Sequence, residues 1–157
     1  MRCIEWAARL CVLAGAVVLA ACASRPVGAP SGKPPLIAEP AVHLPAPARL
    51  RSMKEVQVQA ALRIVEASPN GTYDTDPPEV LLAIPVLEIE LNGNGSVRRI
   101  EVMRYPGQAP ETTQMAIDAV HRAAPFGDVS HLPKPWKFVE VFLFQDDRRF
   151  KPRTLDP

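Results

Sequence analysis

Apolar and charged residues alternate along Val86–Leu91, where leucine or isoleucine is followed each time by glutamate until the last position. A period of two with one charged face predicts a half-buried strand. The turn-forming segment Asn92–Gly95 follows, and Ser96–Arg104 alternates again as a return strand. The alternation slips near Arg98 and Arg99, which predicts a bulge that turns both side chains to water. The two strands are therefore expected to form an antiparallel hairpin.

Two segments change to the three- and four-residue spacing of an amphipathic helix. Residues Glu111–Ala124 carry an alanine-rich stripe and stop at Pro125, which predicts a helix that packs closely on a sheet. Residues Met53–Ala67 repeat apolar positions at the same spacing. Ser52 and Glu55 fit a capping box at the start of this second helix.

Trp136–Phe144 alternates differently, because apolar residues occupy both faces. Such a strand is expected to be covered on both sides or to keep one edge for a partner. Glu140 interrupts the aromatic face. It could pair at the surface with Lys137 or Arg148, or be buried with a raised pKa, and the surface ion pair is the favoured interpretation.

These elements predict an α+β domain over residues 49–147, with two layers: a three-stranded antiparallel sheet and two helices on one of its faces. Residues 148–157 are polar and rich in arginine. They are expected to form a solvated C-terminal tail.

The N-terminus has the pattern of a secretory signal. Arginines flank the start, and the apolar run Leu10–Ala21 is too short to span a bilayer but fits a signal-peptide core. It ends in Leu-Ala-Ala before Cys22, as in a bacterial lipoprotein lipobox. We expect residues 1–21 to be removed and Cys22 to be lipidated, with palmitate among its acyl chains. The alternative is an ordinary signal peptide with an incidental cysteine.

Residues 22–48 form a proline-rich linker. Such a segment prefers extended polyproline II and, at about 3.1 Å per residue, could reach on the order of 70 Å. It is either a spacer that lifts the domain from the bilayer or a plain disordered linker. Ala23-Ser24 after the cysteine, by resemblance to bacterial sorting signals, predicts the periplasmic face of the outer membrane, and the inner membrane is the alternative.

Charge and cysteine content narrow the function. The chain has 18 basic and 17 acidic residues, so no nucleic-acid partner is expected. Cys3 and Cys11 leave with the signal, and the remaining chain then has neither a disulfide nor a thiolate metal site.

No constellation predicts catalysis or a cofactor. His121 and His131, even with nearby aspartates, lack zinc-site spacing, and Ser130-His131 lacks the context of a hydrolase nucleophile. Asp74 and Asp76 lack the glycine and distal glutamate of a calcium loop. We expect no enzyme activity, no cofactor, no metal and no small-molecule substrate.

The order of these elements resembles a known family. Leu87-Ile89-Leu91, then Gly95-Val97-Ile100-Val102, then Ala116-Ala119-Val120-Ala123-Pro125-Phe126, and a proline-led aromatic strand from Pro135 to Phe144 are similar to the C-terminal domains of TonB and TolA. The resemblance covers residues near 80 to 145. It implies a domain that binds envelope proteins and has no catalytic site.

The resemblance also implies a mode of binding, in which a partner adds a strand to the sheet edge. The expected contact residues are Phe138, Glu140, Phe142, Phe144, Arg98 and Arg99. The partner would be an envelope protein, such as an outer-membrane transporter. Coupling to an inner-membrane motor is not expected, because no spanning helix remains after cleavage. The alternative is a structural lipoprotein that self-associates through its third strand.

Overall fold

The computed structural model describes residues 44–156, and both the predicted signal peptide and lipidated Cys22 lie outside them. Helix α1 (Met53–Glu66) is followed by β1 (Val86–Leu91) and β2 (Val97–Arg104). Helix α2 (Glu111–Ala123) precedes β3 (Lys137–Phe144), and the chain continues through β4 (Phe150–Pro152) into the short 3-10 helix η1 (Arg153–Leu155). The α+β class predicted from the sequence is confirmed.

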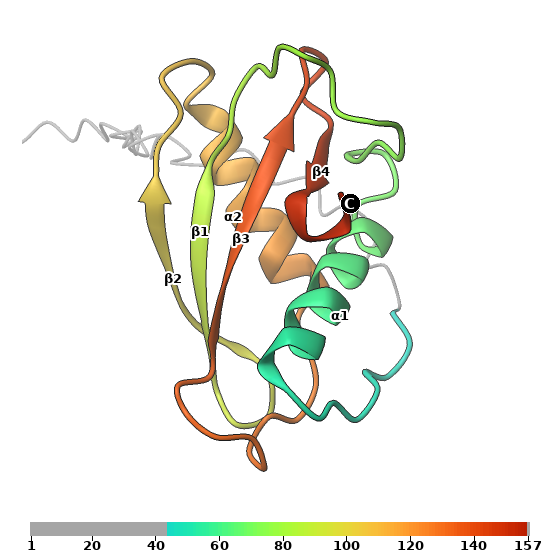
Figure 1. Ribbon diagram of the computed structural model, residues 1–157, viewed down its shortest axis with the longest axis vertical. Helices are drawn as coiled ribbons and strands as arrows, with labels where there is room; N and C mark the ends of the chain where they lie inside the picture. The colour runs from blue at the N-terminus through green and yellow to red at the C-terminus, as the bar shows by residue number, and fades with distance from the viewer. Residues whose placement is uncertain (1–43, 157) are drawn as a thin grey trace, which may run out of the picture. The chain divides into compact units, whose positions relative to one another are not determined.

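The strands form one antiparallel sheet in the order β2-β1-β3-β4 (Figure 1). The predicted count of three strands is wrong, because β4 comes from the segment expected to be a solvated tail. Phe150 of β4 is 2% exposed and packs on Phe142 and Phe144, with ring centroids 5.3 Å away in both cases. The apolar ring of Phe150 therefore holds this polar-looking segment on the sheet.

Helix α1 starts where the serine–glutamate spacing places it. Glu55 N–H donates to Ser52 Oγ at 3.2 Å, while the Glu55 carboxylate accepts from Arg51 N–H instead of from Ser52. The first contact satisfies a donor that the helical ladder leaves open, and the second fixes the residue before the cap. The helix thus begins at Met53, with a capping box displaced by one residue.

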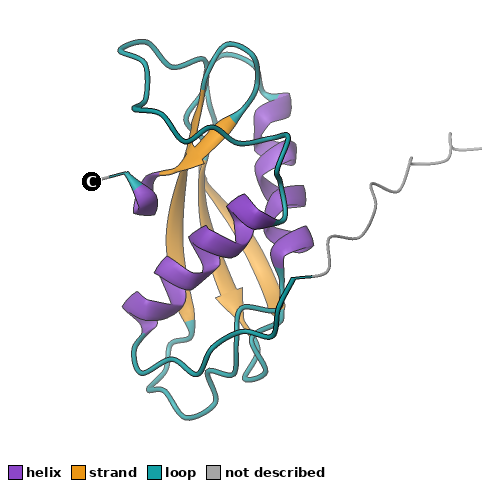
Figure 2. Ribbon diagram, turned by 90° about the vertical axis from the view of Figure 1, so that its right-hand side faces the viewer, coloured by secondary structure: helices purple, strands orange, loops and turns teal. Residues whose placement is uncertain are grey.

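The core lies between the helices and one face of the sheet. Leu87, Ile89 and Leu91 of β1 are at most 2% exposed, whereas the residues between them are half-buried. The alanine stripe of α2 is also fully buried. In Figure 1, α2 lies behind the sheet and α1 covers the side where β3, β4 and η1 meet, and Figure 2 shows the same arrangement from that side.

The β1–β2 turn is docked on the loop that follows α2. Phe126 N–H donates to Gly95 O, and Val129 N–H donates to Gly93 O. Gly95 has φ +80°, and a Cβ added there would lie 2.0 Å from Gly127 O. This contact requires glycine, both for its dihedral angle and for the close approach of two backbones.

Candidate protein-binding edge

Four of the predicted contact residues lie inside the core. The side chains of Phe138, Glu140, Phe142 and Phe144 are at most 5% exposed. They share the face of β3 that packs on the helices. Phe138, for example, packs edge to face on Phe126, with the two ring centroids 6.0 Å apart. Because they are covered by the protein itself, the expectation that these side chains contact a partner is not met in this structure.

Glu140 is the exception among these apolar neighbours. It is 1% exposed, and its Oε1 accepts from Thr154 N–H at 3.1 Å and from Val141 N–H at 3.3 Å. Its Oε2 is buried with no hydrogen-bond partner. Burial raises the pKa of Glu140, although the hydrogen bonds that it accepts act in the opposite direction.

The favoured interpretation of Glu140 as a surface ion pair is therefore wrong. Lys137 pairs with Glu88 at 2.9 Å, and Arg148 pairs with Glu111 at 2.9 Å. Both basic side chains are on the surface, while Glu140 points into the core from the helix-facing side of β3. The buried alternative, with a raised pKa, is the one that the structure supports.

Of the two alternatives for β3, a strand covered on both sides or one with an edge kept for a partner, the structure shows the first, because the protein's own groups lie along this edge. Strand β4 pairs with Phe142–Phe144, and further along β3 the Gln57 side chain donates to Val139 O at 2.8 Å. Gln57 also donates to Thr154 Oγ1 at 2.9 Å, which ties α1 to η1. The C-terminal segment and α1 together therefore engage this edge at Val139 and at Phe142–Phe144, where an added strand would otherwise bind.

The opposite edge of the sheet is open. Strand β2 pairs with β1 alone, and no other strand of residues 44–156 lies against its outer side. Arg98 and Arg99 are exposed on this strand. The predicted bulge is present: Glu90 pairs with Arg99 and Leu91 pairs with Val97, so Arg98 is an extra residue without a partner position in β1. A second irregularity near Met103 closes the other end of the regular stretch.

Backbone alternation fixes which groups face the open side. Phe142 N–H donates to Pro85 O, and Leu91 N–H donates to Trp136 O, so odd-numbered residues of β1 bond to β3. The even-numbered residues Glu88 and Glu90 then bond to their β2 partners. The N–H and C=O groups of Ile100 and Val102 in β2 consequently point away from the sheet and offer a short ladder to an added strand.

Charges surround this edge on the face of the sheet opposite the helices. Arg98 pairs with Glu90 at 3.0 Å, and Arg99 pairs with Glu101 at 2.7 Å. Exposed apolar side chains lie beside them: Met103 is 56% exposed and Tyr105 is 70% exposed. The surface therefore combines free backbone groups with both signs of charge and some apolar area.

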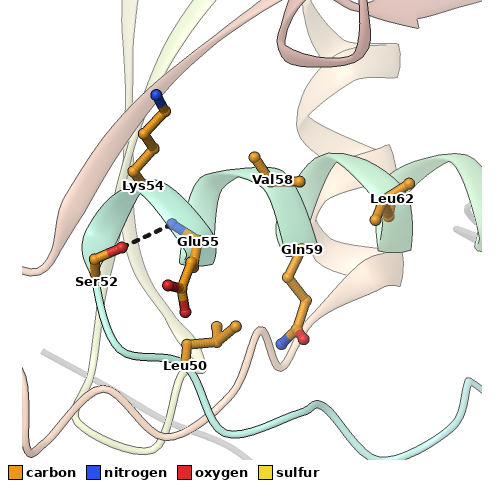
Figure 3. A pocket seen from close by; sticks show the side chains of 7 residues that line it. All are labelled: Leu50, Ser52, Lys54, Glu55, Val58, Gln59 and Leu62. Atoms are coloured by element: carbon orange, nitrogen blue, oxygen red, sulfur yellow. Dashed lines mark hydrogen bonds between the residues drawn. The ribbon is translucent and has the colours of Figure 1, made fainter.

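A shallow groove of about 450 Å³ lies along α1 (Figure 3). Its lining is largely apolar and is formed by Leu50, Ser52, Lys54, Glu55, Val58, Gln59 and Leu62. Lys54 and Glu55 are the charged residues of this lining, and it contains no nucleophile–base pair. The groove offers apolar area to a ligand and no arrangement for chemistry.

The candidate hydrolase residues Ser130 and His131 are engaged elsewhere. His131 Nε2 lies 2.7 Å from Leu50 O, and Ser130 Oγ donates to Asp128 at 2.6 Å instead of to a histidine. The hydrogen bonds that Asp128 accepts from the hydroxyl and the backbone N–H of Ser130 lower the pKa of its carboxyl group. Within residues 44–156 no three His, Cys, Asp or Glu side chains are grouped as a metal site would need.

Two further contacts that hold the C-terminal part of the sheet were not predicted from the sequence. Lys151 and Asp156 form a largely buried ion pair at 3.0 Å, and Tyr73 O–H donates to Leu143 O at 2.9 Å. The available signal was Phe150, a large aromatic residue two positions before a proline in an otherwise polar stretch. The density of arginines around it favoured a solvated tail instead.

No helix of residues 44–156 is long and apolar enough to cross a membrane. Comparison with family models, with curated proteins and with solved structures found no match for this chain.

Proposed function

We propose that this chain is a lipoprotein of the outer membrane, anchored through Cys22, whose periplasmic domain binds another protein of the cell envelope by strand addition. The lipobox pattern before Cys22 and the proline-rich segment after it support the anchoring. The domain is a variant of the TonB and TolA C-terminal architecture in which the C-terminal segment supplies a fourth strand. It acts as a binding module and not as an enzyme.

The observation that carries this proposal is the open edge of β2. Within residues 44–156, β1 and β3 each have a strand on both sides, and the outer strand β4 hydrogen-bonds through Phe150 to Gly71 and Tyr73. Strand β2, in contrast, keeps Ile100 and Val102 unpaired on its outer side. Free edge groups bind an extended segment through main-chain hydrogen bonds, and the flanking side chains select which segment fits. The proposed contact surface accordingly keeps Arg98 and Arg99, adds Glu101 and Met103, and leaves out the residues of β3.

A photo-crosslinking residue tests this surface in living cells. Placed at Met103 of the full chain, p-benzoylphenylalanine is expected to yield protein adducts that mass spectrometry identifies as envelope proteins. The matched control is Val139, which is 40% exposed on β3 and lies away from the β2 edge. Equal adducts from both positions, or none from Met103, would overturn strand addition at β2.

A further inference from the structure

We infer that the open edge of β2 pairs with β2 of a second copy of this chain, antiparallel and centred on Ile100. The inference rests on the proposed use of this edge for strand addition, and it names the chemistry of the strand that fits. The central residues of β2 are Arg99, Ile100 and Glu101. When two copies of this stretch pair antiparallel about Ile100, each Arg99 lies opposite Glu101 of the other copy, and Ile100 lies opposite Ile100.

The register follows from the backbone. Ile100 and Val102 present their N–H and C=O groups outward, so a two-fold axis at Ile100 brings Ile100 opposite Ile100 in a hydrogen-bonded pair. The same axis sets Arg99 opposite Glu101 of the second copy, twice. An axis at Glu101 would instead set the two Glu101 carboxylates opposite each other, which is unfavourable.

The charges already stand in position for this pairing. Arg99 bonds to Glu101 of its own strand at 2.7 Å on the exposed face. Two copies related by the axis would form a closed ring of alternating charge, in which every carboxylate meets two guanidinium groups. A network of this kind is more stabilising than an isolated exposed pair.

The irregularities at the two ends of β2 restrict what else can bind. Arg98 and Met103 are the extra residues of the two register shifts, so only the stretch from Arg99 to Val102 is regular. Bulges and charges on an edge strand prevent unspecific pairing. A segment that matches the stretch in length and charge is still accepted, and a second copy of β2 does match.

Self-pairing and partner binding would compete for one set of backbone groups. The paired area is short, so the association is expected to be weak in solution and favoured when both copies share a membrane surface. The dimer would then be the form that covers the edge in the absence of a partner strand.

Charge reversal separates the two events. In the full chain with the Met103 crosslinker, Arg99→Glu sets a carboxylate opposite Glu101 of the second copy, and the yield of self-adduct is expected to fall by roughly tenfold. Arg99→Glu combined with Glu101→Arg restores complementarity and is expected to restore the yield. Lys137→Glu, with the same change of net charge on another strand, is the control, and thermal melting of each variant checks the fold.

The outcomes are distinct. A self-adduct that links the two β2 peptides and follows the charge swap supports the inference. A self-adduct that is insensitive to Arg99→Glu overturns this register. Adducts only to other proteins overturn the inference but support the proposed function, whereas the absence of any adduct overturns both.

Discussion

Among single residues, Glu140 places a carboxyl group between the buried phenylalanines of β3. Two backbone N–H groups, of Val141 and Thr154, point at one of its oxygens, and the other oxygen has no partner. The side chain thus serves two purposes, since it accepts from a backbone N–H of β3 and holds the start of η1. The cost is a buried group that resists ionisation.

Replacing Glu140 with glutamine should flatten part of the pH dependence of stability. The pKa of Glu140 is raised above its usual value of 4.5, so the folded state holds the proton more tightly and is destabilised as pH rises through the folded pKa. Glutamine keeps the accepting oxygen but does not ionise. As the pH rises from acid to neutral, the unfolding free energy of Glu140→Gln should increase relative to that of the unchanged protein by on the order of 1–3 kcal/mol.

Urea unfolding at about pH 4 and at about pH 8 measures this difference. Glu111, Asp128 and Asp147 have lowered pKa values and change stability in the opposite direction, but they are common to both proteins and cancel. Parallel stability profiles for the two proteins would contradict the assigned role of Glu140.

Gly95 is a second residue whose identity is fixed by its surroundings. Gly95→Ala forces a Cβ to within 2.0 Å of Gly127 O at a positive φ, so the turn and the post-helix loop must separate. We expect a loss of about 2 kcal/mol or more in the unfolding free energy. Gly107→Ala is the matched control, because no atom lies within 4 Å of a Cβ added there, and it should be near neutral. Equal effects in chemical denaturation would refute this account.

Among the helices and strands, the C-terminal segment stands out because it is part of the sheet. Strand β4 is short, yet two of its residues are held outside the sheet: Phe150 N–H donates to Gly71 O, and Lys151 pairs with Asp156. The segment also supplies Thr154 to the group formed with Gln57 and Glu140. It covers the edge of β3 that the sequence pattern left as either covered or open to a partner.

Truncating Phe150 tests whether this segment is structural. Phe150→Ala removes a ring that is 2% exposed and should cost about 3–5 kcal/mol of unfolding free energy, measured by chemical denaturation. Val80→Ala, at a side chain that is 84% exposed, provides the comparison and should have little effect. An effect of Phe150→Ala as small as that of Val80→Ala would show that the segment contributes little to stability, as expected of a solvated tail.

For the molecule as a whole, the predictable part of the fold is the part governed by local periodicity. The strands from Val86 and Lys137 and the helices from Met53 and Glu111 lie within a residue or so of their predicted bounds. Even the bulge at Arg98 was visible, because a bulge breaks the alternation of a single strand.

The candidate site was harder to predict, because edges are a property of strand order. Alternation shows that Phe138 and Phe142 share a face, but not whether that face meets α1 and α2 or a partner. Strand β4 covers the outer side of β3 and leaves β2 as the free edge. Three residues are too few to give a periodic signal, so β4 was not predicted. Arg98 and Arg99 remained candidates because a charged pair on a strand is exposed in either arrangement.

The way in which the chain enters α1 has a mechanical consequence. Arg63 donates to Pro45 O at 2.7 Å, and Ala48 N–H donates to Gln59 Oε1 at 3.2 Å, so the incoming chain is laid along the helix by two side chains. A pulling force applied from the N-terminal side would load these bonds one after the other, as in unzipping. Helix α1 would peel next and release Gln57 from Val139 and Thr154. Tension on the leading segment would thus uncover the β3 edge at Val139, while β4 still paired with Phe142–Phe144.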